Sequence, residues 1–331
     1  MSSYHFRLAT LQAKPAIVTF MNTHWGSRHP LINLPDFFSY YYQDGDATRN
    51  ELNFALCLQE SEEIAALCGF LPSSQERDHI WVSIWCADKK AKGSGLELMT
   101  KMPELTGAKL LSCNNIRPNT IPFYEFLGYT GAAMQHWYRL GTVPCRLAKP
   151  ASLTRLPVSG DGLLRRFETA AEMEAAFCPP EYAKPYKDHW YLARRFFHYP
   201  RQEYLVYGGM LDGVCRVLFC LRKVEVEATV VLRLCDVIGR PALLPHFGQA
   251  LDRLIEEADA EYMDCYCYGL KDEIMESTGF TLRAPQSETI IPHYLTPPLI
   301  ENVDFYLFTS NPEGFVMFRA DGDQDRPNIP Y

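Results

Sequence analysis

Short apolar runs separated by polar turns dominate the first half of the chain. Residues 53–71 (NFALCLQESEEIAALCGFL) contain two apolar runs around the polar turn QESEE, which predicts two strands joined by a turn. The apolar run at 80–87 (IWVSIWCA) predicts a third strand. Further strands are expected at 108–115 and 134–140.

Two helices are expected between these strands. The first follows residue 93 and should end near Pro103, because proline disfavours the helix interior. Its apolar face consists of Leu96, Leu98, Met99 and Met102. The segment 119–129 (NTIPFYEFLGY) predicts a short helix that ends at Gly128. Strands that alternate with helices indicate an α/β layer architecture.

The same order of elements returns in the second half of the chain. A strand, a helix, a second strand and a short helix are expected at 228–239, 242–258, 260–269 and 272–280. A shift of 151 places residues 125–129 (EFLGY) on 276–280 (ESTGF), and 81–88 (WVSIWCAD) on 232–239 (LRLCDVIG). Because one register aligns two separate elements, we infer an internal repeat.

Length and repeat together predict two domains, residues 1–145 and 146–331. The chain has 331 residues, more than one hydrophobic core normally serves. The boundary falls in the proline-containing segment 141–162 (GTVPCRLAKPASLTRLPVSGDG).

Composition narrows the classes of function. A net charge of -8 disfavours nucleic acid as a partner, since such proteins carry clustered lysine and arginine. We predict a soluble, cytoplasmic protein without membrane insertion, because no leader pattern or long apolar span is visible. The eleven cysteines lie mostly inside apolar runs and are expected to be free thiols. No metal site is expected, since the CYC at 265–267 lacks a second pair.

One stretch carries candidate chemistry. The sequence DKKAKGSGLEL at 88–98 lies where a predicted strand gives way to a helix. Glycine allows backbone amides to approach a ligand closely, and a helix N-terminus and lysines add positive charge. Lys90, Lys92, Gly93, Ser94 and Gly95 could therefore bind a diphosphate. An ordinary solvated turn is the alternative.

The order strand, K-x-x-G-x-G, helix, strand and N-x-x-x-x-Y-E-F-L-G-Y resembles the GNAT superfamily of acyl-CoA-dependent N-acyltransferases. The resemblance covers about residues 50–140, with Lys90 where the family usually has Arg or Gln. The second half resembles a degenerate copy, with Leu244 and His246 in place of the two loop glycines. The resemblance implies an α+β protein of two tandem lobes, each a mixed, mostly antiparallel sheet flanked by helices.

The resemblance also implies the cofactor-binding residues, with acetyl-CoA as co-substrate. Backbone amides from Lys90 to Gly95, including Lys92, Gly93 and Ser94, would hold the diphosphate. The pantetheine arm would pair with Ile84, Trp85 and Cys86. Asn119 would contact the cofactor, and Tyr124 would protonate the leaving thiolate. The general base is left open among Asp78, His79, His29, Asn114 and Asn115.

Two further segments are expected to bind the acceptor. Residues 24–30 (HWGSRHP) supply Trp25, Arg28 and His29, whose side chains suit sugar faces and acidic groups. The C-terminal segment 318–331 supplies Asp323, Asp325 and Arg326. It resembles the tail of tandem GNAT-like proteins of bacterial surface-polysaccharide synthesis, which implies a sugar acceptor. The alternative for the carboxylates is a structural capping role between the lobes.

The leading hypothesis is therefore an acyltransferase that moves an acetyl or related acyl group to the amino group of a sugar, nucleotide sugar or sialic-acid-like sugar. The 1–145 lobe would bind acyl-CoA, and the 146–331 lobe would shape the acceptor site. Two alternatives remain: an aminoacyl-tRNA-dependent transferase for a cell-wall precursor, and a non-catalytic sugar-binding protein with a relic site. The oligomeric state is not predicted.

Overall fold

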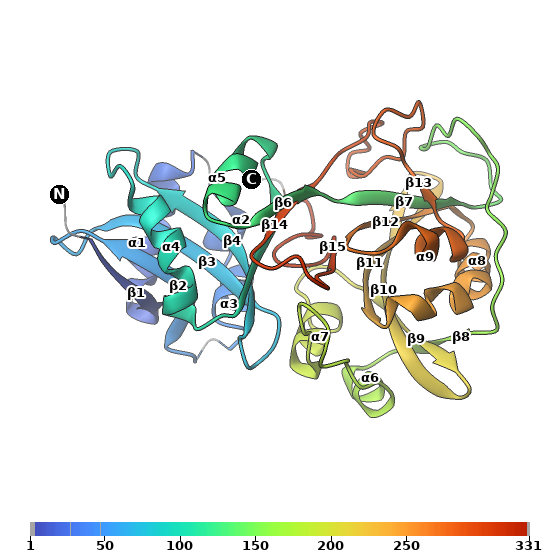
Figure 1. The fold of residues 1–331 in the computed structure, drawn as a ribbon, viewed down its shortest axis with the longest axis horizontal. Coiled ribbons are helices and arrows are strands. Elements are labelled where there is room, and N and C mark those ends of the chain that lie inside the picture. The colour runs from blue at the N-terminus through green and yellow to red at the C-terminus, as the bar shows by residue number, and fades with distance from the viewer. Residues whose placement is uncertain (1–3, 27, 47, 330–331) are drawn as a thin grey trace.

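The computed structural model describes residues 4–26, 28–46 and 48–329. Two β-sheets form two lobes that lie side by side (Figure 1). Strands β4 and β5 are parallel in the first sheet, and β11 and β12 are parallel in the second. The other paired strands are antiparallel. This confirms the predicted α+β class with two mixed, mostly antiparallel sheets.

The first lobe is built on the strand order β1-β2-β3-β4-β5-β14-β6. Its strands are β1 His5–Thr10, β2 Glu51–Leu58, β3 Ile64–Pro72, β4 His79–Ala87, β5 Leu110–Ile116, β6 Thr130–Ala133 and β14 Tyr306–Thr309. Its helices are α1 Lys14–His24, α2 Pro30–Asn33, α3 Pro35–Tyr42, α4 Ser94–Thr106 and α5 Ile121–Phe126, with short 3-10 turns Leu11–Ala13 and Pro118–Thr120.

The side chains of the first sheet alternate between two cores. Leu56 and Leu67 pack with α1 and α3, whereas Ala55 and Cys57 pack with α4 and α5. This is the period-two pattern of a strand that is covered on both faces. Helix α4 continues past Pro103, where the sequence predicted its end. Pro103 lies on the exposed side of the last turns, and Gly107 (φ 69°) ends the helix instead.

The second lobe is built on the strand order β13-β7-β12-β11-β10-β9-β8. Its strands are β7 Gln135–Leu140, β8 Leu163–Phe167, β9 Leu205–Leu211, β10 Val214–Val226, β11 Thr229–Gly239, β12 Ala260–Tyr268, β13 Thr281–Leu282 and β15 Met317–Phe318, which pairs with β12. Its helices are α6 Ala170–Ala176, α7 His189–Phe196, α8 Gly248–Glu257 and α9 Asp272–Ser277, with a 3-10 turn Pro241–Phe247. The 151-residue shift superposes α5 on α9 in register, as an internal repeat requires.

Each lobe contains a gap between its two parallel strands. In β4 an extra residue lies between Val82 and Trp85, which pair with Phe70 and Cys68 of β3. In β11 an extra residue, Cys235, lies at the equivalent position. Such a bulge bends its strand. Accordingly, β4 pairs with β5 only over residues 79–81, and β11 with β12 only over 230–233.

The two lobes exchange strands. β7, from the first half of the chain, lies between β12 and β13 in the second sheet, and Figure 1 shows it extending into that lobe. β14, from the second half, lies between β5 and β6 in the first sheet. The predicted division at residues 145 and 146 therefore does not separate the two sheets.

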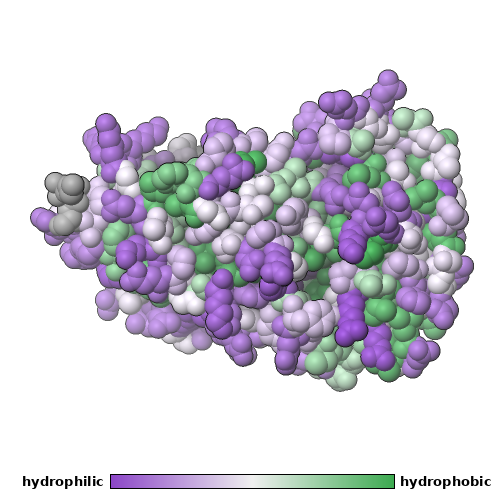
Figure 2. Space-filling model, in the orientation of Figure 1, coloured by the Kyte–Doolittle hydropathy of each residue, from purple (hydrophilic) through white to green (hydrophobic). Residues whose placement is uncertain are grey.

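The polarity of the surface and the state of the cysteines are those that the composition predicts. On the face shown in Figure 2, hydrophilic side chains cover much of both lobes and hydrophobic ones form separate patches. Among the described residues no helix has the length and apolarity needed to cross a membrane. All eleven cysteines are free, as expected.

The strand exchange predicts that the fragment 1–145 does not fold by itself. Without β14, strands β5 and β6 lose their shared partner, and the fully buried side chains of Leu307 and Phe308 leave the core. Circular dichroism should show no cooperative thermal transition for this fragment. The same fragment with residues 303–311 attached through a flexible linker should recover one. A sharp transition of the unextended fragment would contradict the exchange.

Candidate active site

A cavity of about 480 Å³ occupies the gap between β4 and β5. Residues from both ends of the chain line it. It brings together ten of the residues that the sequence singled out: Ile84, Trp85, Cys86, Tyr124, Trp25, His29, Asn114, Asn115, Asp323 and Arg326. The cavity is therefore the structure's candidate active site.

One wall of the cavity is a free strand edge. β4 pairs with β3 as far as Ala87, but no strand of the described chain pairs with its other edge beyond Trp81. An extended ligand can add to such an edge through main-chain hydrogen bonds. The Trp85 ring packs on Phe123, with centroids 4.9 Å apart, and its Nε1 is enclosed without a partner.

The glycine loop follows this edge and starts α4. Gly93 has a φ of 86°, in the left-handed region that favours glycine. Gly95 lies tight against the end of β4: a Cβ added there would be 3.2 Å from the Ala87 Cβ and 3.3 Å from the Trp85 ring. Glycine at 95 thus lets the helix N-terminus approach the strand end.

Only part of the loop backbone is open to a ligand. The Lys90 amide donates to the Asp88 carboxylate at 3.0 Å, and the Ser94 amide donates to the Ala91 carbonyl. The Ser94 hydroxyl also donates to Ala91, at 2.8 Å, so this side chain anchors the loop. In the described chain the amides of Lys92, Gly93 and Gly95 have no such acceptor, and first-turn amides of a helix normally seek one.

The loop therefore fits a diphosphate with these three amides, the positive end of α4 and the exposed lysines 90 and 92. The negative charge of the Asp88 carboxylate would repel a bound anion, although this carboxylate already accepts a hydrogen bond from the Lys90 amide. Asn119 lies exposed in the 3-10 turn, next to Thr120 of the cavity wall. Its contact with a cofactor stays a prediction.

Tyr124 of α5 lies at the inner wall of the cavity. It is 4% exposed and stacks on Phe308 of β14, with ring centroids 4.0 Å apart. Its hydroxyl has no protein partner among the described residues. Burial raises the pKa of Tyr124, so the phenol keeps its proton at neutral pH.

His29, Asp323 and Arg326 form the polar side of the cavity. The Asp323 carboxylate accepts a hydrogen bond from the Ser83 hydroxyl at 2.9 Å and pairs with the Arg326 guanidinium at 3.3 Å. The His29 Nδ1 is enclosed without a partner. Burial, together with Arg326, lowers the pKa of His29 to about 4, although Asp323 opposes the shift. The imidazole is therefore neutral at pH 7.

The other candidates for the general base lie outside the cavity or already form hydrogen bonds within the protein. Asp78 pairs with Lys109 at 2.8 Å on the surface, and the His79 Nδ1 accepts the Tyr186 amide at 2.7 Å at the start of β4. The Asn114 and Asn115 side-chain amides line the cavity but donate to the C-terminal segment 318–324.

Two predicted acceptor residues lie outside the cavity. Arg28 is exposed and does not line it. Asp325 is buried and faces the second lobe, where it pairs with Arg222 at 3.0 Å and accepts the Tyr204 hydroxyl at 2.9 Å. The sequence reasoning missed Ser83 and Gln324. Gln324 lies between two residues that were chosen, but Ser83 carries no local signal.

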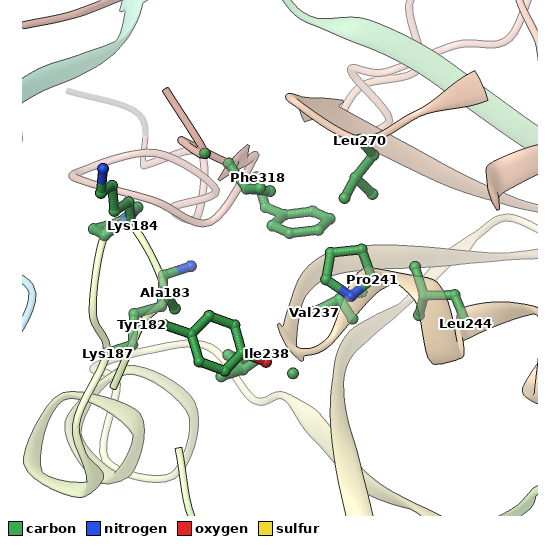
Figure 3. A pocket seen from close by; sticks show the side chains of 14 residues that line it. Tyr182, Ala183, Lys184, Lys187, Val237, Ile238, Pro241, Leu244, Leu270 and Phe318 are labelled. Carbon is green, nitrogen blue, oxygen red and sulfur yellow. The ribbon is translucent and has the colours of Figure 1, made fainter. Parts of the chain in front are cut away.

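The corresponding gap of the second lobe is filled by the chain. β15 pairs with β12, and the Ala320 amide donates to the carbonyl of Cys235 on β11 at 3.0 Å. Figure 3 shows Phe318 between Leu270 and Pro241 in the apolar cavity of about 130 Å³ that remains. With the shift of 151, Pro241 replaces Lys90 and the buried Leu244 replaces Gly93.

Comparison with known proteins supports the fold. No family model and no curated protein matches the chain. A GCN5-related N-acetyltransferase from Anabaena variabilis superposes with a TM-score of 0.53 at 10% identity, over 93% of this chain and 73% of that one. A conserved protein of unknown function from Enterococcus faecalis V583, described as a probable N-acyltransferase, gives 0.53 at 8% identity, over 93% and 72%. The chain therefore has the fold of tandem GNAT structures.

The free amides of the loop predict a specific effect of Gly93→Ala. A Cβ at this left-handed residue strains the turn by roughly 1 kcal/mol and shifts the amides. We expect coenzyme A to bind about 10-fold more weakly by isothermal titration. Gly107→Ala is the matched control, because Gly107 is also left-handed and lies at the other end of α4. Equal loss of affinity in the two variants would contradict the role of the loop.

Proposed function

We propose that this protein is an acyl-CoA-dependent N-acyltransferase that moves an acetyl group to the amino group of a sugar acceptor. The observation that carries the proposal is the cavity between β4 and β5. It combines a free strand edge, a protonated phenol and a neutral imidazole, and the glycine loop at the start of α4 follows that strand edge outside the cavity lining.

The residues of the first lobe fit acetyl-CoA, which supplies an acyl group activated as a thioester. The amides of Lys92, Gly93 and Gly95 would hold the diphosphate. The β4 edge at Ile84, Trp85 and Cys86 would bind the pantetheine arm as an added strand. The second lobe offers no equivalent, because residues 317–320 occupy its gap.

Two side chains would handle protons. Tyr124 holds a proton on its hydroxyl and would give it to the departing sulfur, a thiolate of ordinary pKa near 8.5. The Nδ1 of His29 has no hydrogen-bond partner in the described chain and would accept a proton from the attacking amine. Asp323 and Arg326 would orient the acceptor beside it, and Ser83 fixes the carboxylate.

The thiol of Cys86 is not a suitable nucleophile. Burial raises the pKa of Cys86 to about 11, so the thiolate is scarce at neutral pH. Transfer would therefore pass directly from thioester to amine, and we propose sequential kinetics without an acyl-enzyme.

A sugar acceptor is supported by the rim of the cavity. Trp25 is 38% exposed and lies beside His29, with ring centroids 5.4 Å apart. An exposed aromatic ring suits the apolar face of a sugar. The resemblance of the C-terminal tail supports amino sugars, nucleotide sugars or sialic-acid-like sugars of bacterial surface glycans as the acceptor class.

The proposal is tested by release of coenzyme A thiol from acetyl-CoA with a panel of amino sugars. Acetylated product identified by mass spectrometry would support it. Activity that disappears after RNase treatment would instead indicate an aminoacyl-tRNA donor. Bound coenzyme A without turnover on any amine would favour the non-catalytic alternative.

Tyr124→Phe should lower kcat about 10- to 100-fold, because only the proton donor is removed. KM for acetyl-CoA should change less than threefold, and stability should be nearly unchanged, because the hydroxyl has no protein partner in the described chain. The control is Tyr129→Phe: Tyr129 also stacks on Phe308, at 5.3 Å, but does not line the cavity. Steady-state kinetics with unaltered kcat for Tyr124→Phe would exclude it as the acid.

A further inference from the structure

A second cavity, of about 350 Å³, adjoins the candidate active site. It lies between the lobes and shares Asn115, Gln324 and Arg326 with the first cavity. Four arginines line it: Arg222, Arg233, Arg319 and Arg326. Apart from Arg326, the proposed function uses none of these arginines.

Three of these four arginines have a carboxylate partner. The pairs are Arg222–Asp325 at 3.0 Å, Arg233–Asp264 at 3.3 Å and Arg326–Asp323 at 3.3 Å. Arg319 forms no ion pair with any described residue. The cavity therefore carries one guanidinium more than its surrounding carboxylates can neutralise.

The Arg319 side chain is fixed by its neighbours, but it lacks a counter-charge and part of its hydrogen-bonding capacity is unused. Its side chain is 5% exposed, and its guanidinium lies 3.8 Å from the centroid of the Phe305 ring. Nη1 donates to the Gln324 side-chain oxygen at 2.9 Å, whereas Nε is enclosed without an acceptor. A buried charge without a counter-charge costs several kcal/mol. Such a side chain, fixed by stacking, is preorganised for an anion.

A neighbouring group is also unsatisfied. His293 lines the same cavity, is buried, and its Nδ1 has no partner. Burial and the adjacent Arg233 and Arg319 lower the pKa of His293, so its ring is neutral and can donate one hydrogen bond. Arg319 and His293 thus both line this cavity, and each has a buried nitrogen without a partner.

We propose that this cavity binds an anionic group, a carboxylate or a phosphate, of the acceptor, with Arg319 as the main contact. The inference rests on the proposed function and specifies its substrate. The acceptor would carry an acidic group in the arginine cavity and an amine that reaches past Gln324 and Arg326 toward His29. An amino sugar with a carboxylate or phosphate has this chemistry.

Direct anion binding tests the site without catalysis. We expect inorganic phosphate or acetate to raise the Tm of the intact protein by about 2–4 °C relative to chloride at equal ionic strength. Arg319→Gln should abolish this shift, and Arg319→Lys should retain part of it. Arg216→Gln is the control, because it removes the same charge from an exposed position on β10.

Catalysis then identifies the acidic group. Glucosamine, glucosamine 6-phosphate and glucosaminuronic acid serve as neutral, phosphorylated and carboxylated acceptors with acetyl-CoA. Arg319→Gln should raise KM for the preferred acidic acceptor about 10- to 100-fold and leave KM for acetyl-CoA within twofold. Preference for the phosphorylated or the carboxylated sugar distinguishes the two sources of charge.

The outcomes separate the two proposals. Anion stabilisation that depends on Arg319, without acylation of any amine, would support the anion site and overturn the proposed function. Equal use of neutral and acidic sugars, unchanged in Arg319→Gln, would overturn the anion site and leave the acyltransferase standing. Equal anion shifts in the wild type and Arg319→Gln would also overturn it.

Discussion

A buried lysine between two carboxylates fixes the C-terminal segment on which both sites depend. The Lys187 ammonium lies 2.6 Å from an oxygen of Asp236 on β11 and 2.6 Å from an oxygen of Asp321. Arg195 of α7 adds hydrogen bonds to the carbonyls of Ala320 and Gln324, at 3.0 and 2.8 Å. Loss of one partner from such a buried network is strongly destabilising. The network therefore holds residues 317–326 between the lobes.

The position of this segment makes the duplicated fold asymmetric. Its start, including Phe318, fills the gap of the second lobe, where the glycine loop is also missing. Its end brings Asp323 and Arg326 into the open gap of the first lobe. Between them, Arg319 reaches the arginine cavity. One segment thus fills one gap, supplies polar side chains to the other, and contributes Gln324 and Arg326, which line both cavities.

The sequence predicted the parts of this arrangement that depend on neighbouring residues. The glycine loop, the short helix with Tyr124 and the 151-residue repeat each lie within a continuous stretch, so their pattern is visible in the chain. Helix α4 passed Pro103 because Pro103 lies on its exposed side. The site around His29 was predicted only as separate segments, and the structure shows that they share a cavity.

The strand exchange could not be predicted, because β14 meets β5 across nearly 200 residues of sequence. The arginine cavity is equally non-local: Arg222, Arg233 and Arg319 come from three different segments, and none is unusual in its own sequence. The division of Asp323 and Asp325 between two cavities also follows from the path of the tail. The spacing of these two aspartates in the sequence gives no sign that they line different cavities.

The number of coenzyme A molecules bound per chain tests the account most directly. Both lobes share the bulge and the divergent parallel strands, but in the described chain residues 317–320 fill the gap of the second lobe. Isothermal titration of the full-length chain should give a stoichiometry of one. A stoichiometry of two, or no binding at all, would contradict the account.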